Sequence, residues 1–263
     1  MDIIAILYIF AFLEGSIIGS FLNVVIDRLP SKESLLGRSH CDVCKRRLGM
    51  PELVPIFSYI MQKGVSACCH RKLKIQYPLI EFLTAATFVL IVGLYHSLFG
   101  VDRLLNELPV VITLFALAAI TIAISIIDFR HHIIPDELQV CLIVAALAHA
   151  YLAGHWSTAS LMAGLIVSQP LLMIYMLTRG RGMGFGDVKL EVGLGIWLGI
   201  IPGLLGVYLG FLIGAIYGLA LLIIHRAKRQ SHIAFGPSLL IGGWLAYFIG
   251  DIVIQFYRGL LGI

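Results

Sequence analysis

The stretch LPVVITLFALAAITIAISIIDFRHHIIPDEL, residues 108–138, decides the fold of this chain. Its first 20 residues contain no charged side chain. An α-helix rises about 1.5 Å per residue, so about 20 apolar residues cross the hydrocarbon core of a membrane. Asp128 follows directly, with Arg130 and two histidines close behind it. The stretch therefore predicts a membrane-spanning helix that ends in a carboxylate at the membrane edge.

The rest of the chain repeats this apolar pattern. Hydrophobic residues make up 59% of the 263 residues and charged residues only 13%, whereas soluble domains have about 25% charged residues. This composition predicts an all-α polytopic membrane protein with about eight spans. Only Pro202 and Gly203 mark the division between the sixth and seventh spans. The expected spans are residues 3–26, 79–99, 108–127, 134–153, 158–178, 188–203, 204–224 and 237–257.

The first span and the polar segment after it define the expected domain organisation. The N-terminus MDIIAILYIF lacks a basic region and a small-residue cleavage site, so we expect a retained span and not a signal peptide. The sizeable polar piece of the chain is the loop 29–78. We therefore expect a first transmembrane helix at 1–28, a small cytosolic loop domain at 29–78 and a seven-helix membrane domain at 79–263.

A run of glycines in the sixth and seventh expected spans predicts close helix packing. Glycines three and four residues apart let helix backbones approach each other in lipid, as in the small-xxx-small pattern. We interpret this pattern as structural. The glycines concerned are Gly195, Gly199, Gly203, Gly206, Gly210, Gly214 and Gly218.

The distribution of Lys and Arg predicts the orientation. If the N-terminus lies outside, seventeen of the nineteen basic residues face the cytoplasm, ten of them between Arg28 and Lys74. The cytoplasmic set ends with Arg226, Lys228 and Arg229. We therefore expect the loop 29–78 to be cytosolic and to touch anionic lipid of the inner leaflet. A nucleic-acid partner is not expected, because no recognition module is visible.

A second carboxylate is expected at the same depth as Asp128. The stretch GMGFGDVKLEVG, residues 182–193, places Asp187 at the cytoplasmic start of the sixth span. Ionisable groups at membrane depth are costly and are candidate functional residues. Two carboxylates that share one proton suit peptide hydrolysis, because one can activate water while the other protonates the substrate. Gly184 and Gly186 would let a substrate strand approach.

Structural interpretations remain open for the polar residues of this stretch. Asp187 could simply cap its helix, since aspartate is a good N-terminal residue. Glu191 is expected to pair with a basic or amide group. Lys189 is expected to pair with Glu191 or a lipid phosphate, although a role in tuning the two aspartates is also open.

Four of the five cysteines cluster in the loop 29–78, in HCDVCKRRL and GVSACCHRKL. Cys41 and Cys44 have the spacing of half a zinc site. A reducing cytoplasm disfavours a disulfide. We expect a structural zinc ion bound by Cys41, Cys44, Cys69 and one of Cys68 or His70; the alternative is reduced thiols without a metal.

Taken together, these motifs resemble those of the type 4 prepilin peptidases, bifunctional leader peptidases and N-methyltransferases of bacterial inner membranes. The resemblance covers nearly the whole chain. It rests on the Cys41–Cys44 pair and on five further motifs, which are GSFLNVVIDRLP (19–30), YPLIE (77–81), IDFRHHIIPD (127–136), GFGDVK (184–189) and FGPSL (235–239).

The resemblance implies an aspartic endopeptidase whose catalytic pair falls on Asp128 and Asp187. Its substrates would be type IV prepilins or pilin-like secretion and competence proteins. It would cut their leader at the cytoplasmic membrane face and then methylate the new N-terminus with S-adenosylmethionine. The family links the cytosolic loop to methylation.

The chain departs from the family at one position. The family has two CxxC pairs, and alignment on YPLIE places the second pair at 66 and 69, where this chain has Ser66 and Cys69. Cys68 is displaced by two positions, so a four-sulfur site needs a shifted backbone or His70. Two other classes of function are conceivable. A carboxylate-coupled transporter would give ion flux, and a non-enzymatic assembly factor would tolerate both Asp→Asn changes.

Overall fold

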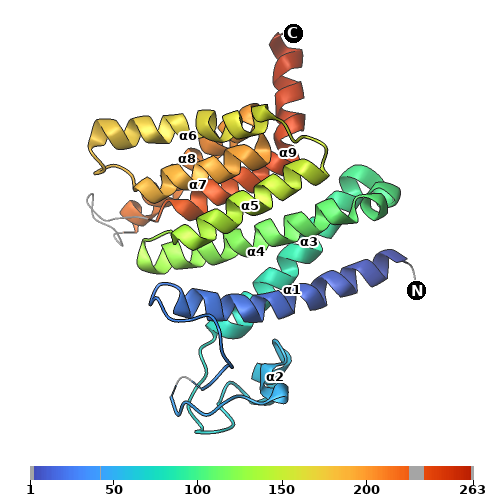
Figure 1. Cartoon of the computed structure of the whole chain (residues 1–263), viewed down its shortest axis with the longest axis vertical. Coiled ribbons are helices and arrows are strands. Elements are labelled where there is room, and N and C mark those ends of the chain that lie inside the picture. Colours follow the sequence, from blue (N-terminus) through green and yellow to red (C-terminus); the bar gives the residue numbers. More distant parts are fainter. Residues whose placement is uncertain (1–2, 42, 225–233, 262–263) are drawn as a thin grey trace. The chain divides into compact units, whose positions relative to one another are not determined.

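A computed structural model describes residues 3–41, 43–224 and 234–261 (Figure 1). Within these residues the chain forms helices and two isolated antiparallel bridges, and no strand is present. The predicted all-α class is confirmed. The helices are α1 Ile3–Arg28, η1 Met50–Leu53, α2 Phe57–Met61, α3 Gln76–Asn106, α4 Leu108–His131, α5 Asp136–Leu152, α6 Thr158–Thr178, α7 Phe185–Leu198, α8 Ile200–Ile223 and α9 Gly236–Leu261.

Six of the described helices are long and apolar enough to cross a membrane, namely α1, α3, α4, α6, α8 and α9. Helices α5 and α7 have 17 and 14 residues. At 1.5 Å per residue they extend only about 25 Å and about 21 Å, less than the roughly 30 Å hydrocarbon core. The membrane character is confirmed, but the count of eight spans is not.

The boundary between α7 and α8 lies earlier than the sequence suggests. Helix α7 ends at Leu198, and Gly199 has a φ of 83°. A positive φ favours glycine, which therefore ends the helix here. Pro202 lies in the first turn of α8, where a proline needs no intrahelical partner for its nitrogen. The expected division at Pro202 and Gly203 is therefore wrong by about one turn.

The chain forms two compact units, residues 1–123 and 124–263, which divide within α4. Each unit is described by itself below. The three-part organisation at 1–28, 29–78 and 79–263 stays a prediction. The basic residues Arg226, Lys228 and Arg229, which contribute to the predicted orientation, lie outside the described residues.

In the first unit, α1 packs tightly along α3. A Cβ atom built on Gly15 would lie 2.6 Å from the Ala85 Cα, and one on Gly19 would lie 2.7 Å from the Glu81 Cα. The loop between the two helices contains η1 and α2 and forms a small lobe at one end of them (Figure 1). This packing fixes the ends of α1 and α3 on either side of the loop.

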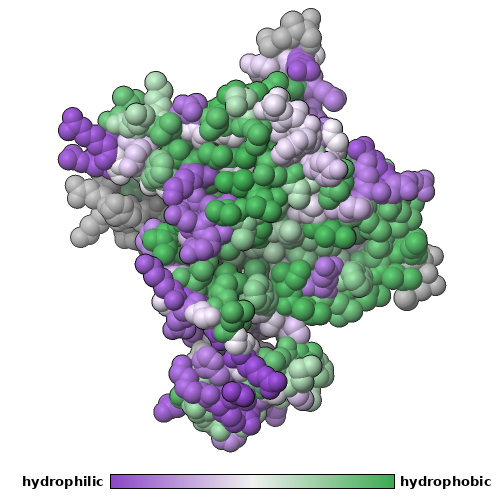
Figure 2. Space-filling view, in the orientation of Figure 1, coloured by the Kyte–Doolittle hydropathy of each residue, from purple (hydrophilic) through white to green (hydrophobic). Residues whose placement is uncertain are grey.

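The outer surfaces of the helices suit a lipid environment. On α1 the large side chains of Phe10, Ile17 and Phe21 are exposed. Figure 2 shows mostly hydrophobic surface over the helices and mostly hydrophilic surface over the cysteine-containing loop. Exposure of many large apolar side chains to water is unfavourable, so these surfaces are consistent with helices that face lipid.

In the second unit, Gly206 and Gly210 of α8 pack against α9, as the small-xxx-small pattern predicts, whereas Gly203 faces Val167 of α6. A Cβ on Gly206 would lie 3.2 Å from the Gly243 Cα, and one on Gly210 would lie 2.9 Å from the Leu239 Cα. A Cβ on Gly242 would lie 2.4 Å from the Gly206 carbonyl oxygen. The backbones therefore touch directly, which brings the start of α9 close to the rest of the unit.

We predict that Gly242→Ala destabilises the protein by about 1–3 kcal/mol, because its new methyl group meets backbone atoms and forces α8 and α9 apart. The measurement is the midpoint of thermal unfolding in detergent. Gly250→Ala on the same helix is the matched control, because its nearest neighbour lies 3.7 Å away. An unchanged midpoint for Gly242→Ala would contradict the packing described here.

Candidate active site

Asp128 lies in the last turn of α4, and its side chain is buried, with 5% exposed. Its Oδ2 accepts a hydrogen bond of 3.0 Å from the backbone N–H of Gly236, the first residue of α9. These two residues are 108 positions apart in the sequence. The amide thus orients one carboxylate oxygen, and a backbone donor of this kind stabilises negative charge.

Asp187 lies in the first turn of α7, three residues after the N-cap Gly184. It is also buried, with 9% exposed. Its backbone N–H donates to the Gly184 carbonyl at 3.2 Å. The capping interpretation stays a prediction, because an acidic residue in the first turn is favourable but no side-chain cap hydrogen bond is found for α7 among the described residues. Capping alone does not explain why the carboxylate is buried beside a second one.

The structure brings the two aspartates into one site. Their carboxylates interact electrostatically. Ile134 lies against both sides of the site: a Cβ built on Gly186 would lie 3.4 Å from the Ile134 Cβ, and one on Gly236 would lie 3.3 Å from the Ile134 Cδ1. Ile134 therefore lies between Gly186, which precedes Asp187, and Gly236, which binds Asp128.

Lys189 does not pair with Glu191, contrary to one of the expectations. Its Nζ lies 2.7 Å from an oxygen of Asp136 at the start of α5, in a partly exposed ion pair. This ion pair ties the starts of α5 and α7 together. Because Lys189 pairs with Asp136, it is not the basic partner that was expected for Glu191.

Glu191 is a third buried carboxyl, one helical turn after Asp187. It is 1% exposed, and its Oε1 has no hydrogen-bond partner among the described residues. It also interacts electrostatically with Asp187. The predicted basic or amide partner for this oxygen is therefore not found in that part of the chain.

Sequence reasoning missed the role of Gly236. The signal was present, because Gly236 belongs to the FGPSL motif, but nothing in the sequence connects that motif to Asp128. A Cβ built on Gly236 would lie 2.7 Å from the Asp128 Oδ2. Only glycine allows this approach, so the motif supports the site through its backbone and not through a side chain.

The cysteines of the first unit lie in two similar turns. In the first turn the Cys41 N–H donates to the Arg46 carbonyl and the Lys45 N–H donates to the Cys41 carbonyl. In the second turn the Ser66 N–H donates to Arg71 and the His70 N–H donates to Ser66 in the same pattern. Ser66 therefore occupies the position in its turn that Cys41 occupies in the first turn.

Cys68 supplies the sulfur that Ser66 lacks. The sulfur atoms of Cys41, Cys44, Cys68 and Cys69 all lie within 4.8 Å of one another. The Cys41–Cys69 and Cys44–Cys68 sulfur atoms are 3.7 Å and 3.1 Å apart. Four sulfurs around zinc, each at about 2.3 Å, lie about 3.8 Å from one another, so the cluster fits a tetrahedral zinc site. Among the described residues, the potential ligand group contains Cys68 and not His70.

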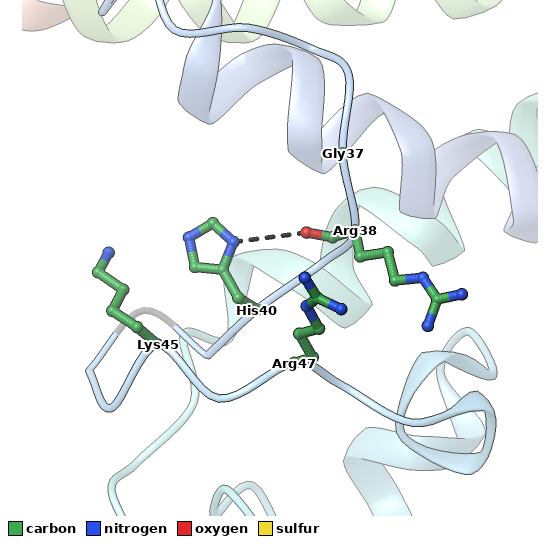
Figure 3. A pocket seen from close by; sticks show the side chains of 5 residues that line it. All are labelled: Gly37, Arg38, His40, Lys45 and Arg47. Atoms are coloured by element: carbon green, nitrogen blue, oxygen red, sulfur yellow. Dashed lines mark hydrogen bonds between the residues drawn. The ribbon is translucent and has the colours of Figure 1, made fainter.

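The two thiols of the first turn differ, because the Arg46 backbone lowers the pKa of the Cys44 thiol but hydrogen bonding to Cys68 outweighs it and, with other effects, raises that pKa to about 11. Backbone amides of Cys44 and Val43 lower the pKa of the buried Cys41 thiol to about 6. A thiolate, not a thiol, is the metal ligand. Beside this turn is a basic hollow of about 570 Å³ lined by Gly37, Arg38, His40, Lys45 and Arg47 (Figure 3).

Two family profiles match different parts of the chain. The profile described as "Bacterial Peptidase A24 N-terminal domain" matches residues 13–95, which include the cysteine cluster. The profile described as "Type IV leader peptidase family" matches residues 115–219, which include Asp128 and Asp187. No solved structure matches the chain.

Several curated relatives named "Prepilin leader peptidase/N-methyltransferase" match most of the chain. The Bacillus subtilis protein is 33% identical over 94% of this chain and 96% of its own length. The Neisseria gonorrhoeae protein is 31% identical over 91% and 89%, and the Aeromonas salmonicida protein is 29% identical over 94% and 92%. This chain belongs to the type IV leader peptidase family.

Proposed function

We propose that this protein is a bacterial inner-membrane aspartic endopeptidase that removes the leader of type IV prepilins or pilin-like proteins and N-methylates the new N-terminus. The relatives' names support both activities. The observation that carries the peptidase assignment is the buried pair of Asp128 and Asp187. Both are buried, their carboxylates interact electrostatically, and the Gly236 amide orients the carboxylate of Asp128.

The pair suits hydrolysis of a peptide bond. Two buried carboxylates that interact would share one proton, because both cannot ionise cheaply. The ionised member takes a proton from the attacking water. The protonated member polarises the substrate carbonyl, and the pair then returns a proton to the leaving amine. The proton belongs to the pair, so neither aspartate has a fixed role as acid or base.

The proposed arrangement relative to the membrane follows from charge. With the N-terminus outside, both aspartates and the cysteine loop face the cytoplasm, where the leader of a newly made precursor would be. The apolar helix of the precursor would lie among the spans. The basic side chains of the loop, including those around the hollow in Figure 3, would contact anionic lipid.

The test of this function is incubation of the purified protein, in detergent, with a type IV prepilin or pseudopilin precursor. The expected result is a product shortened by its leader, which gains a methyl group when S-adenosylmethionine is added. A precursor that contains the family's cleavage sequence and yet stays intact would contradict the peptidase assignment. Ion flux in proteoliposomes without cleavage would instead support a transporter.

We also propose that Cys41, Cys44, Cys68 and Cys69 bind one structural zinc ion. The ion would hold together the two turns of a loop that has little apolar core of its own. Purified wild-type protein is expected to contain about one zinc ion per chain, measured by inductively coupled plasma mass spectrometry. Cys44→Ser is expected to lose most of it.

Cys141→Ser is the matched control for the zinc measurement. Cys141 is a cysteine of α5 outside the cluster, so its substitution is expected to leave the zinc content unchanged. Metal-free wild-type protein, or a Cys44→Ser variant that keeps its full zinc content, would contradict the four-sulfur site.

A further inference from the structure

The second unit contains a third buried carboxyl that the hydrolytic mechanism does not use. Glu191 lies four residues after Asp187 on α7, and side chains at this spacing lie on the same face of a helix. Glu191 is 1% exposed, and it interacts electrostatically with Asp187, which in turn interacts with Asp128. The three side chains therefore form a carboxyl row, with Asp187 in the middle.

The charges around the carboxyl row leave Glu191 without an identified counter-ion in the part of the chain that the structure describes. Lys189 pairs with Asp136. Helices α5, α6, α8 and α9 pack against α7, and α6 and α8 carry no charged side chain. The other titratable groups on these helices and at the end of α4 are exposed (Arg130, His131, His132, Glu137, Cys141, Tyr151, Tyr208, Tyr217, Asp251, Tyr257 and Arg258), or lie beside Phe185 (Tyr175) or Trp197 (His149 and Tyr247). Ionisation of Glu191 would therefore add a negative charge beside that of the aspartates.

A second buried acceptor lies at the same level of the neighbouring helix. A Cβ built on Gly193 of α7 would lie 2.9 Å from the Leu142 Cδ2 of α5, so the two helices run side by side here. Gln139 precedes Leu142 by three residues, and Glu191 precedes Gly193 by two. Gln139 is 4% exposed, and its Oε1, like the Glu191 Oε1, has no hydrogen-bond partner among the described residues. A proton on Glu191 would supply a donor in a layer that has unpaired acceptors.

Burial favours the neutral form of Glu191. A carboxylate that loses its water without gaining a paired cation is costly, so a buried acid in this setting keeps its proton. The negative charge that Asp128 and Asp187 share increases this cost, because like charges repel more strongly where water is excluded. The carboxyl row as a whole is therefore expected to hold two protons, one on Glu191 and one on the aspartates.

We propose that Glu191 is a positioning residue that keeps the catalytic aspartates singly protonated at a higher pH than the two aspartates alone could. The inference rests on the proposed peptidase function and adds a third carboxyl to that site. Glu191 acts through Asp187, by its charge, and takes no part in breaking the peptide bond.

The order in which the carboxyl row loses its protons explains this effect. When the pH rises, one of the two protons leaves to water, and two negative charges remain among three carboxyls. The charges repel each other least at the two ends of the row, on Asp128 and Glu191, so the remaining proton lies on Asp187. The Gly236 amide also favours charge on Asp128. The aspartates thereby keep the proton that polarises the substrate carbonyl. Without Glu191, the same loss would remove that proton.

The experiment is the pH dependence of leader cleavage by the full-length protein in detergent, measured as kcat/KM for wild type, Glu191→Gln and Glu191→Met. Neither replacement can ionise. Both are expected to keep the acidic limb of the profile, because Glu191 is already uncharged there. Both are expected to move the alkaline limb to lower pH by at least about half a unit, on the scale of one nearby charge in a protein interior. Two chemically different replacements are used so that one folded variant suffices.

Glu137→Gln is the matched control, because Glu137 is an exposed glutamate in the first turn of α5. Its profile is expected to coincide with that of wild type. His132, which interacts electrostatically with Asp128, is present in every protein compared, so it does not account for a difference between them.

Two results would overturn the inference and leave the peptidase standing. A shift of both limbs to lower pH would mean that Glu191 is ionised in the working range, since removal of a permanent negative charge weakens proton binding by the aspartates throughout. An alkaline limb that stays in place in a folded variant would mean that Glu191 does not act on the aspartates. Wild type that cleaves no precursor at any pH would instead contradict the proposed peptidase function, and the inference with it.

Discussion

Asp128→Asn and Asp187→Asn are each expected to lower the rate of leader cleavage at least about a thousandfold, the scale of loss found when one member of a catalytic unit is removed. Asparagine keeps the shape of the side chain but can neither take a proton from water nor share one with its partner. The measurement is the initial cleavage rate of a precursor by each purified variant.

Asp136→Asn is the matched control for this pair. Asp136 is an exposed aspartate at the start of α5, where it pairs with Lys189, so its loss is expected to leave the rate within about threefold of wild type. The double variant Asp128→Asn/Asp187→Asn is expected to be no slower than either single variant, because the two residues act as a unit. Additive losses would mean that the aspartates act independently.

Gly236→Ala is expected to reduce cleavage about a hundredfold, on the scale of losing one oriented donor at a reacting group. The new Cβ would lie 2.7 Å from the Asp128 Oδ2, closer than real Cβ atoms approach other atoms. The carboxylate or the start of α9 must therefore move, and the hydrogen bond from the Gly236 N–H is lost. The readout is the cleavage rate together with the thermal unfolding midpoint.

Gly259→Ala tests whether any glycine on α9 would show this effect. A Cβ at Gly259 would meet no atom of the described residues within 4 Å, so the substitution is expected to leave cleavage unchanged. If Gly236→Ala cleaves as fast as wild type while its midpoint is also unchanged, the amide of Gly236 does not orient Asp128 during the reaction. A lower midpoint with a normal rate would give Gly236 a structural role only.

Local signals explain why much of the fold was predictable. The uncharged run 108–127 predicts a helix, and α4 begins at Leu108 and extends to His131. The helix continues past the apolar run, through Asp128 to His131. The apolar length alone could not place this end. Likewise, α7 ends at Leu198 because Gly199 has a positive φ, which the sequence does not display.

The site was only partly predictable, because its remaining contacts are not local. The topology argument placed Asp128 and Asp187 at the same depth, and the structure brings their carboxylates together. The hydrogen bond from Gly236 joins segments that no short-range pattern connects. Glu191 is buried, and its Oε1 lacks a hydrogen-bond partner in the described part of the chain; this depends on how α7 packs, which periodicity does not reveal.

The cysteine loop shows the same limit. Its spacing predicts a metal site, but not whether Cys68 or His70 completes it. The choice depends on two turns that have the same backbone hydrogen bonds. Ser66 has the position in the second turn that Cys41 has in the first. The sulfur of Cys68, two residues after Ser66, lies in the cluster.

The most direct test of the central claim is mass spectrometry of the N-terminus of a prepilin co-expressed with wild type, Asp128→Asn or Asp187→Asn. The account predicts a shortened, methylated N-terminus with wild type and an intact leader with either variant, each variant being inserted in the membrane at the wild-type level. A shortened N-terminus produced by either asparagine variant would contradict the assignment of Asp128 and Asp187 as the catalytic pair.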